Sequence, residues 1–124
     1  MNKNSNIGFI GLGNMGKPIF DNLNKNFSNI FCFDKDTSKL KKNNSSSLIE
    51  IFEKCKIIIF CIESNEQIID IIKKNIIKKN TVIVDLTSSL PDLTKKISSY
   101  LKKFESHYID AGMSGGASGA TNGT

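Results

Sequence analysis

The chain has 124 residues, 39% of them hydrophobic, which is enough for the core of one domain and too short for two. The formal net charge is +5, and all 17 basic residues are lysines. Nucleic-acid sites favour arginine, so a positive charge that comes from lysine alone predicts no nucleic-acid partner. Three cysteines without metal-ligand spacing, no signal peptide and no apolar run long enough to span a membrane predict a soluble cytoplasmic domain without a metal.

The first predicted elements are a short strand and a helix joined by glycines. Residues 7–16 read I-G-F-I-G-L-G-N-M-G, so an apolar strand over 7–10 runs into the spacing G-x-G-x-x-G. Met15, Ile19 and Leu23 then recur every fourth position, which indicates one face of a helix. A strand, a glycine turn and a helix in this order are the context that the dinucleotide-binding motif requires.

Each of the three glycines has a physical role in such a loop. Gly11 lets the chain turn sharply, Gly13 lets a pyrophosphate approach the backbone, and Gly16 lets the following helix pack closely on the strand. The N–H groups and the positive dipole end at the start of that helix favour an anion. We expect a dinucleotide here, and the alternative is a purely structural glycine turn.

The next segment contains a second strand and the start of a second helix. An apolar strand over 30–33 ends at Asp34, and residues 36–46 are polar, as in a short helix or a loop. Ser47 and Glu50 have the spacing of a capping box, which predicts that a helix begins there.

The second half of the chain continues this alternation, with apolar strands expected over 57–62, 81–85 and 108–110. An isoleucine stripe at helical spacing predicts a helix after the first of these strands. The stripe consists of Ile68, Ile69, Ile72, Ile76 and Ile77. Ser89 is predicted to cap the helix before the last strand, with Pro91 in its first turn. The alternation predicts an α/β fold, a Rossmann-like doubly wound parallel sheet that binds its ligand at the carboxyl ends of the strands.

Asp34 ends the second predicted strand, where a carboxylate can accept hydrogen bonds from the adenosine ribose hydroxyls. A carboxylate there would repel a 2′-phosphate, so it favours NAD over NADP as the cofactor. Lys35 and Lys39 leave NADP possible, because either lysine could neutralise a phosphate. The other interpretation of Asp34 is a turn or helix-cap residue.

Two polar strings follow the last two predicted strands. Thr87 and Ser88 lie in D-L-T-S-S-L-P, where hydroxyls could bond to a nicotinamide ribose, although hydroxyls at helix caps are routine. Ser114, Gly115 and Gly116 follow the last strand, where backbone N–H groups and a hydroxyl would fit a substrate carboxylate. A flexible glycine-rich linker is the alternative for this tail.

Together these strings resemble the β-hydroxyacid dehydrogenase family, which includes 3-hydroxyisobutyrate, tartronate-semialdehyde and 6-phosphogluconate dehydrogenases. G-F-I-G-L-G-N-M-G is similar to the opening string of the family, D-L-T-S-S-L-P to its D-x-S-T-x-x-P pattern, and D-A-G-M-S-G-G-A-S-G-A-T-N-G-T to its substrate string. The resemblance covers residues 7–124. It implies an NAD(P)-dependent oxidoreductase that transfers hydride between nicotinamide and a small 3-hydroxy acid, and a homo-oligomer for the complete enzyme.

The resemblance also implies roles for individual residues. The implied cofactor contacts, beside Asp34, are Gly11, Leu12, Gly13, Asn14, Met15, Gly16, Ile62, Glu63 and Ser88. The implied substrate contacts are Ser114, Gly115 and Gly116. The family usually has proline at the positions of Glu63 and Gly112, and glycine at the second position is a feature of 6-phosphogluconate dehydrogenases.

The general acid/base lysine of the family lies in a G-x-x-x-K-x-x-N string, which this chain lacks. The resemblance therefore predicts that residues 1–124 are one dinucleotide-binding domain, incomplete at its C-terminal end. The family's all-helical second domain and its catalytic lysine would lie beyond Thr124. We expect neither Lys17 nor His107 to replace that base. The alternatives are a 6-phosphogluconate dehydrogenase-type enzyme and a non-catalytic dinucleotide-binding module.

Overall fold

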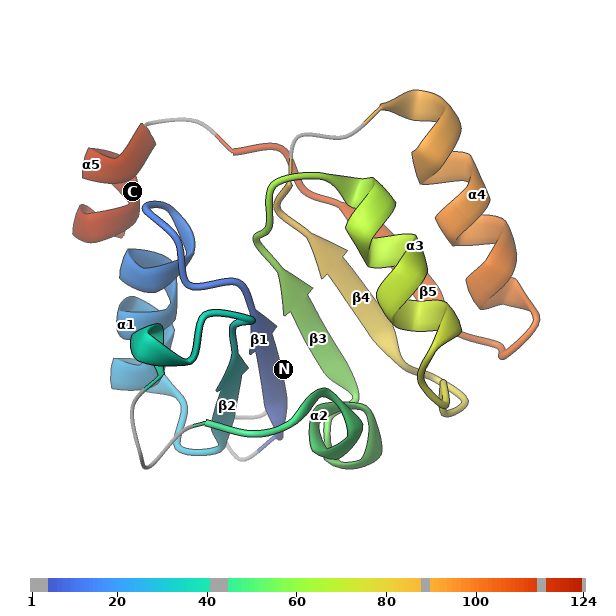
Figure 1. The fold of residues 1–124 in the computed structure, drawn as a ribbon, viewed down its shortest axis with the longest axis horizontal. Coiled ribbons are helices and arrows are strands. Elements are labelled where there is room, and N and C mark those ends of the chain that lie inside the picture. Colours follow the sequence, from blue (N-terminus) through green and yellow to red (C-terminus); the bar gives the residue numbers. More distant parts are fainter. Residues whose placement is uncertain (1–4, 41–44, 88–89, 114–115, 124) are drawn as a thin grey trace.

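The computed structural model describes residues 5–40, 45–87, 90–113 and 116–123, and Figure 1 shows the arrangement of their helices and strands. The strands in this part of the chain are β1 (Ile7–Ile10), β2 (Ile30–Phe33), β3 (Ile57–Phe60), β4 (Val82–Asp85) and β5 (His107–Asp110). The α-helices are α1 (Gly16–Asn26), α2 (Leu48–Lys54), α3 (Asn65–Lys73), α4 (Pro91–Lys102) and α5 (Gly116–Asn122). A short 3-10 helix, η1 (Thr37–Lys39), follows β2.

All strand pairs in the sheet are parallel, and the strand order is β2-β1-β3-β4-β5. The chain leaves β1 toward β2 at one edge and later returns to place β3 on the other side of β1. This reversal is the topological switch point at which open α/β sheets bind ligands. Together with helices on both faces, it confirms the predicted Rossmann-like, doubly wound fold.

The two faces of the sheet carry different helices. The larger apolar cluster joins Ile58 and Ile83 of the sheet to buried residues of α2, α3 and α4. The smaller cluster joins Phe9 of β1 and Cys32 of β2 to Phe20 of α1. Thus α1 lies on one face of the sheet, and α2, α3 and α4 lie on the other.

The face that carries α1 is covered only in part. The strand register places Val82, Val84, His107 and Ile109 on the same side of the sheet as α1. All four side chains are partly or largely exposed, and Ile109 is 50% exposed. In Figure 1, α5 lies beside α1, while α3 and α4 lie at the opposite end of the sheet.

The start of α2 matches its prediction from the sequence. The Ser47 hydroxyl accepts a hydrogen bond from the Glu50 N–H at 3.1 Å, and the Glu50 carboxylate accepts one from the Ser47 N–H at 3.3 Å. This reciprocal pair is the predicted capping box, and it satisfies two donors at the start of a short helix.

The end of α3 differs from the prediction. The helix ends at Lys73, so the expected extension of its isoleucine stripe through Ile76 and Ile77 is wrong. The Asn75 side chain donates to the Ile71 carbonyl at 2.8 Å, which satisfies a terminal carbonyl and helps the chain to leave the helix. Ile77 is still buried, whereas Ile76 is 84% exposed.

The cap of α4 also differs from the prediction. Pro91 is the first residue of the helix and Leu90 is the N-cap, so the expected cap at Ser89 is wrong. Proline suits the first helical position because its φ is already helical and its missing N–H would have no partner in the helix. The residue before the proline therefore becomes the cap. Ser89 itself lies outside the described residues.

No helix within the described ranges is both long enough and apolar enough to cross a bilayer.

Candidate functional site

The carboxyl ends of the five described strands lie side by side along one edge of the sheet. Ile10 pairs with both Phe33 and Phe60, Phe60 pairs with Asp85, and Asp85 pairs with Asp110. The loops that follow these residues therefore begin at the same level. The glycine loop, Asp34, the segment after β3 and the tail after β5 all lie along this edge.

The glycine loop shows why glycine is needed at two of its three positions. Gly11 has φ +106°, and a Cβ there would lie 2.1 Å from the Cys61 carbonyl oxygen. A Cβ on Gly16 would lie 2.0 Å from the Gly11 carbonyl oxygen. Both glycines therefore allow backbone segments to approach each other more closely than any side chain permits.

Gly13 has a different environment. A Cβ built on Gly13 would meet no atom within 4 Å, so the fold itself does not require glycine there. The space above this residue is open at the start of α1, where a helix dipole favours an anion. A pyrophosphate that approaches the backbone would use this space, so the loop fits a dinucleotide.

Asp34 fastens the glycine loop to the end of β2. Its Oδ2 accepts a hydrogen bond from the Leu12 N–H at 2.7 Å, and its Oδ1 accepts one from the Asp36 N–H at 2.8 Å. The second bond shows the predicted turn role of Asp34. A carboxylate has about four acceptor sites, so ribose hydroxyls could still bind, and that contact remains a prediction.

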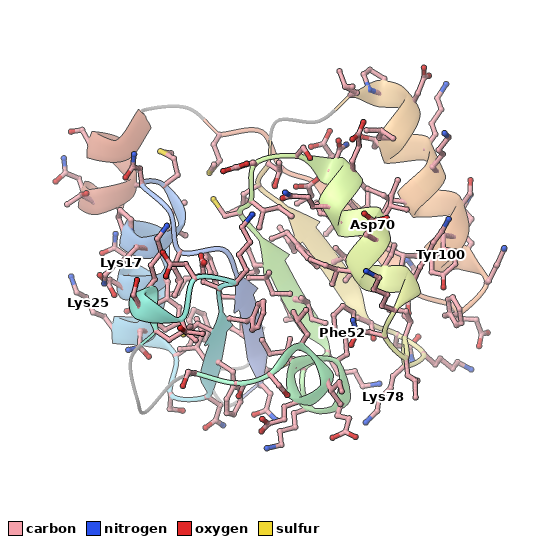
Figure 2. The ribbon with its side chains drawn as sticks, in the orientation of Figure 1. Lys17, Lys25, Phe52, Asp70, Lys78 and Tyr100 are labelled. Carbon is pink, nitrogen blue, oxygen red and sulfur yellow. The ribbon has the colours of Figure 1, made fainter. Side chains whose placement is uncertain are left out.

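A cavity of about 570 Å³ lies beside the glycine loop and along α1. Its lining includes Gly13, Asn14, Lys17, Lys25 and Lys39. Lys17 also forms an ion pair with Asp21 at 3.1 Å, and Figure 2 shows Lys17 and Lys25 along α1. Asp21 also lines the cavity, so the excess positive charge there comes from Lys25 and Lys39, and this charge favours a ligand that carries phosphate.

The N-cap of α1 is Met15, whose side chain makes no capping hydrogen bond. The capping box of α2 contrasts with this open start, because Ser47 and Glu50 occupy the first turn there. Leu12, in the same loop as Met15, is only 4% exposed and packs into the smaller core cluster. Its side chain therefore supports the loop, and its N–H is already bound to Asp34.

The segment after β3 contains two more of the predicted contacts. The Ile62 N–H donates to Thr87 Oγ1 at 3.2 Å, so Ile62 can offer a ligand its half-buried side chain but not its amide. Glu63 is exposed. Asn65 begins α3 with only 2% exposure, and its Nδ2 has no partner among the described residues. A buried donor of this kind is costly unless a ligand or water meets it.

Thr87 has a structural partner where the sequence predicted a ribose contact. It is only 6% exposed, and its hydroxyl accepts the hydrogen bond from Ile62. Ser88, Ser114 and Gly115 lie outside the described residues, so their predicted contacts stay predictions. Gly116 begins α5 with φ +60°, so the interpretation of the whole tail as a flexible linker is wrong.

Cys55, before β3, and Cys61, after it, have weakly acidic thiols. Burial raises the pKa of Cys55 to about 11. Burial, and secondarily the negative charge of Asp85, raises the pKa of Cys61. Because the thiolate is the reactive form, these cysteines are poor candidates for nucleophiles at neutral pH.

Sequence reasoning missed Asp85 and Tyr108. Asp85 ends β4 with 0% exposure, and its carboxylate accepts hydrogen bonds from the Thr87 N–H at 2.7 Å and from the Tyr108 hydroxyl. One feature of the sequence indicates that Asp85 is buried. Asp85 lies two positions after Ile83 in the strand, so both side chains point to the same face.

Comparison with known proteins agrees with this geometry. Residues 6–124 match the model of a family described as the NAD binding domain of 6-phosphogluconate dehydrogenase. The chain belongs to this family. Its loop at Gly11, Gly13 and Gly16 is the part of the site whose geometry fits the NAD pyrophosphate.

Relatives of known function are hydroxyacid dehydrogenases. The chain is 32% identical to 2-(hydroxymethyl)glutarate dehydrogenase of Eubacterium barkeri, a match over all of this chain and 45% of that protein. It is 30% identical to mitochondrial 3-hydroxyisobutyrate dehydrogenase of Mus musculus, over 94% of this chain and 38% of the relative. The chain therefore spans less than half the length of these relatives.

The fold is shared with a solved 3-hydroxyisobutyrate dehydrogenase of Mycobacterium tuberculosis, determined with L-serine. The TM-score is 0.90 at 21% sequence identity, over 98% of this chain and 44% of that one. At this identity the likeness supports the fold alone.

Proposed function

We propose that this chain is the cofactor-binding part of an NAD(P)-dependent oxidoreductase of the 3-hydroxyisobutyrate dehydrogenase type. The complete enzyme would transfer hydride between nicotinamide and a small 3-hydroxy acid, a reaction whose chemistry the cofactor supplies. Family membership and the named relatives support this class of enzyme. The proposal includes a homo-oligomeric complete enzyme, on the resemblance alone, and a cytoplasmic location, on the cysteine usage of the sequence.

The open space above Gly13 is the observation that carries the proposal for this chain. A structural turn would need glycine only where atoms crowd it, as at Gly11 and Gly16, whereas no atom crowds Gly13. Lys25 and Lys39 add positive charge beside the loop, whereas the charge of Lys17 is offset by its ion pair with Asp21. The loop would hold the pyrophosphate, and Asp34 would orient the adenosine ribose while it fastens the loop to β2.

The residues of this chain would bind and orient, while the proton transfer would need a base outside it. No lysine in the sequence lies in the family's G-x-x-x-K-x-x-N context. General acid–base catalysis contributes about 10²- to 10⁴-fold to the rate, so we expect the 124-residue chain to bind NADH with almost no turnover. A 6-phosphogluconate-type enzyme is the second candidate, supported by Gly112 at the position where the family usually has proline.

Gly13→Val tests the cofactor site. A branched side chain in the open space would exclude the pyrophosphate, so NADH titration followed by cofactor fluorescence should show loss of binding. The fold should be unaffected because no atom lies within 4 Å of the new Cβ, and the urea unfolding midpoint serves as the control. Normal NADH binding by a folded Gly13→Val chain would contradict the proposal.

Asp34→Ala tests the preference between NAD and NADP. The substitution also removes the bond that holds the glycine loop and the bond within the turn after β2, so the informative quantity is the ratio of NADH to NADPH affinity. We expect the preference for NADH to shrink by about 1–2 kcal/mol, the value of one or two buried hydrogen bonds. Equal affinity for both cofactors in the parent chain would contradict the ribose role and leave the dinucleotide site standing.

A further inference from the structure

A hydrogen-bonded chain of side chains joins β3, β4 and β5 at the edge where the candidate site lies. The Asp85 carboxylate accepts bonds from the Tyr108 hydroxyl of β5 and from the Thr87 N–H at 2.7 Å. The Thr87 hydroxyl in turn accepts the Ile62 N–H at 3.2 Å. One buried carboxylate thus connects the segment after β3 to the last strand of the sheet.

The burial of Asp85 needs an explanation, because a carboxylate with 0% exposure is costly to bury. Two of the groups that donate to it, the Thr87 N–H and the Tyr108 hydroxyl, are neutral. Hydrogen bonds to a charged acceptor are stronger than those between neutral groups, so this carboxylate can fix both donors firmly.

The opposite end of the same two strands shows that a charge is not required to join them. There the Ser106 hydroxyl accepts the Thr81 N–H at 3.1 Å and donates to the Lys78 carbonyl at 2.8 Å. Neutral hydroxyls therefore suffice to fasten β4 to β5 at the amino end. The link through a carboxylate lies at the carboxyl end of the described strands, next to the segments that would meet a ligand.

We propose that Asp85, Tyr108 and Thr87 are positioning residues of the cofactor site. They hold the Ile62 segment at a fixed spacing from β4 and β5, so that Ile62 presents its side chain, and not its amide, to the bound dinucleotide. The inference rests on the proposed function and deepens it, because none of the three residues belongs to the glycine loop or to its anchor Asp34.

A matched pair of substitutions at Thr87 tests the inference in the 124-residue chain. Thr87→Val keeps the shape but removes the acceptor for the Ile62 N–H, whereas Thr87→Ser keeps the hydroxyl. We expect the affinity for NADH to fall about 3- to 10-fold in the valine variant, as for one lost hydrogen bond. The serine variant should restore it to within about twofold of the parent, which a role in packing alone would not produce.

The two tyrosines of the chain provide a second matched pair. Tyr108→Phe removes the hydroxyl that donates to Asp85, while Tyr100→Phe changes a residue of α4 that lines a separate groove with Ile69 of α3. NADH affinity should fall in Tyr108→Phe and stay at the parent value in Tyr100→Phe. If Thr87→Val fails to fold, the tyrosine pair decides the question by itself.

The outcomes separate this inference from the proposed function. A parent chain that binds no NADH would overturn the proposed function and the inference with it. A parent that binds NADH, with folded Thr87→Val and Tyr108→Phe variants of equal affinity, would overturn only the positioning role. Loss of stability without loss of affinity in these variants would have the same meaning.

Discussion

The two faces of the sheet differ in how completely they are covered. The face under α2, α3 and α4 contains side chains with no exposure, such as Ile58 and Ile83. On the other face α1 packs over β1 and β2, and the strands beyond them keep partly exposed residues such as Val84 and Ile109. One face of the sheet is therefore covered by helices, while the other face is an exposed apolar surface toward β5.

The difference shows that one face of these strands contributes to the stability of the core, while the other face leaves apolar side chains exposed that another surface could contact. Ile83 and Val84 are neighbours in sequence, yet Ile83 is sealed in the larger cluster and Val84 remains accessible. A substitution on β4 or β5 should therefore change the free energy of unfolding strongly if the side chain faces the covered side of the sheet, and weakly if it faces the open side.

Truncation of one isoleucine on each face should give the largest contrast. Ile83→Ala, at 0% exposure, should lower the free energy of unfolding by about 2–5 kcal/mol, because it removes apolar contacts and leaves a cavity. Ile109→Ala, at 50% exposure on the adjacent strand, should lower it by less than about 1 kcal/mol. Urea unfolding of both variants checks this, and equal losses would mean that the face near β5 is packed as well as the other.

Enlargement of a side chain should give the next contrast. A Cβ on Gly8 would lie 2.4 Å from Ile51 Cγ2 of α2, so Gly8→Ala should cost about 1–3 kcal/mol as α2 is pushed away. Val84→Ile, on the open face, should change stability by no more than about 0.5 kcal/mol. The same unfolding measurement applies, and an unharmed Gly8→Ala chain would show that the covered face has spare room.

The capping box of α2 should give the smallest effect, because it acts on one short helix of the covered face. Ser47→Ala should cost about 1 kcal/mol at neutral pH, the usual value of an N-cap, as measured by urea unfolding. Ser99→Ala, at an exposed position within α4, is the control and should change stability little.

The Ser47 effect should also depend on pH. Hydrogen bonds from the Ser47 backbone and side chain lower the pKa of Glu50 from its usual 4.5. A carboxyl whose pKa is lowered by folding stabilises the protein above its unfolded value, and this contribution disappears as the pH falls through the folded value. The difference between parent and Ser47→Ala should therefore shrink below pH 4.5. A constant difference would mean that Glu50 takes no part in the cap.

The sequence predicted the strands and most helix starts because these depend on neighbouring residues. The isoleucine run that opens β3 and the spacing of Ser47 and Glu50 are local features, and the structure confirms both. The end of α3 was missed because the isoleucine pattern continues past it, while the side chain of Asn75 binds the Ile71 carbonyl. Ile77 remains buried, so the hydrophobic pattern was right about its burial and wrong about its helix.

The internal bonds of the candidate site could not be predicted in the same way. Asp34 binds the Leu12 N–H only because β1 and β2 lie side by side, and Tyr108 reaches Asp85 across two paired strands. These partners are far apart in the sequence, and no spacing rule connects them. The sequence therefore indicated the glycine loop and its anchor Asp34, but not the bonds that join the loops to each other.

The carboxyl ends of the strands lie at the same level, so the spacing of the strands sets the length of a ligand that could contact both the glycine loop and the tail after β5. Neighbouring strands lie about 4.8 Å apart, so the three steps from β1 to β5 separate the glycine loop from the start of the tail by about 14 Å. A single phosphate or a small hydroxy acid is too short to contact both places. Contact at both ends requires either one extended molecule laid across the strand ends or two molecules that meet partway along this edge.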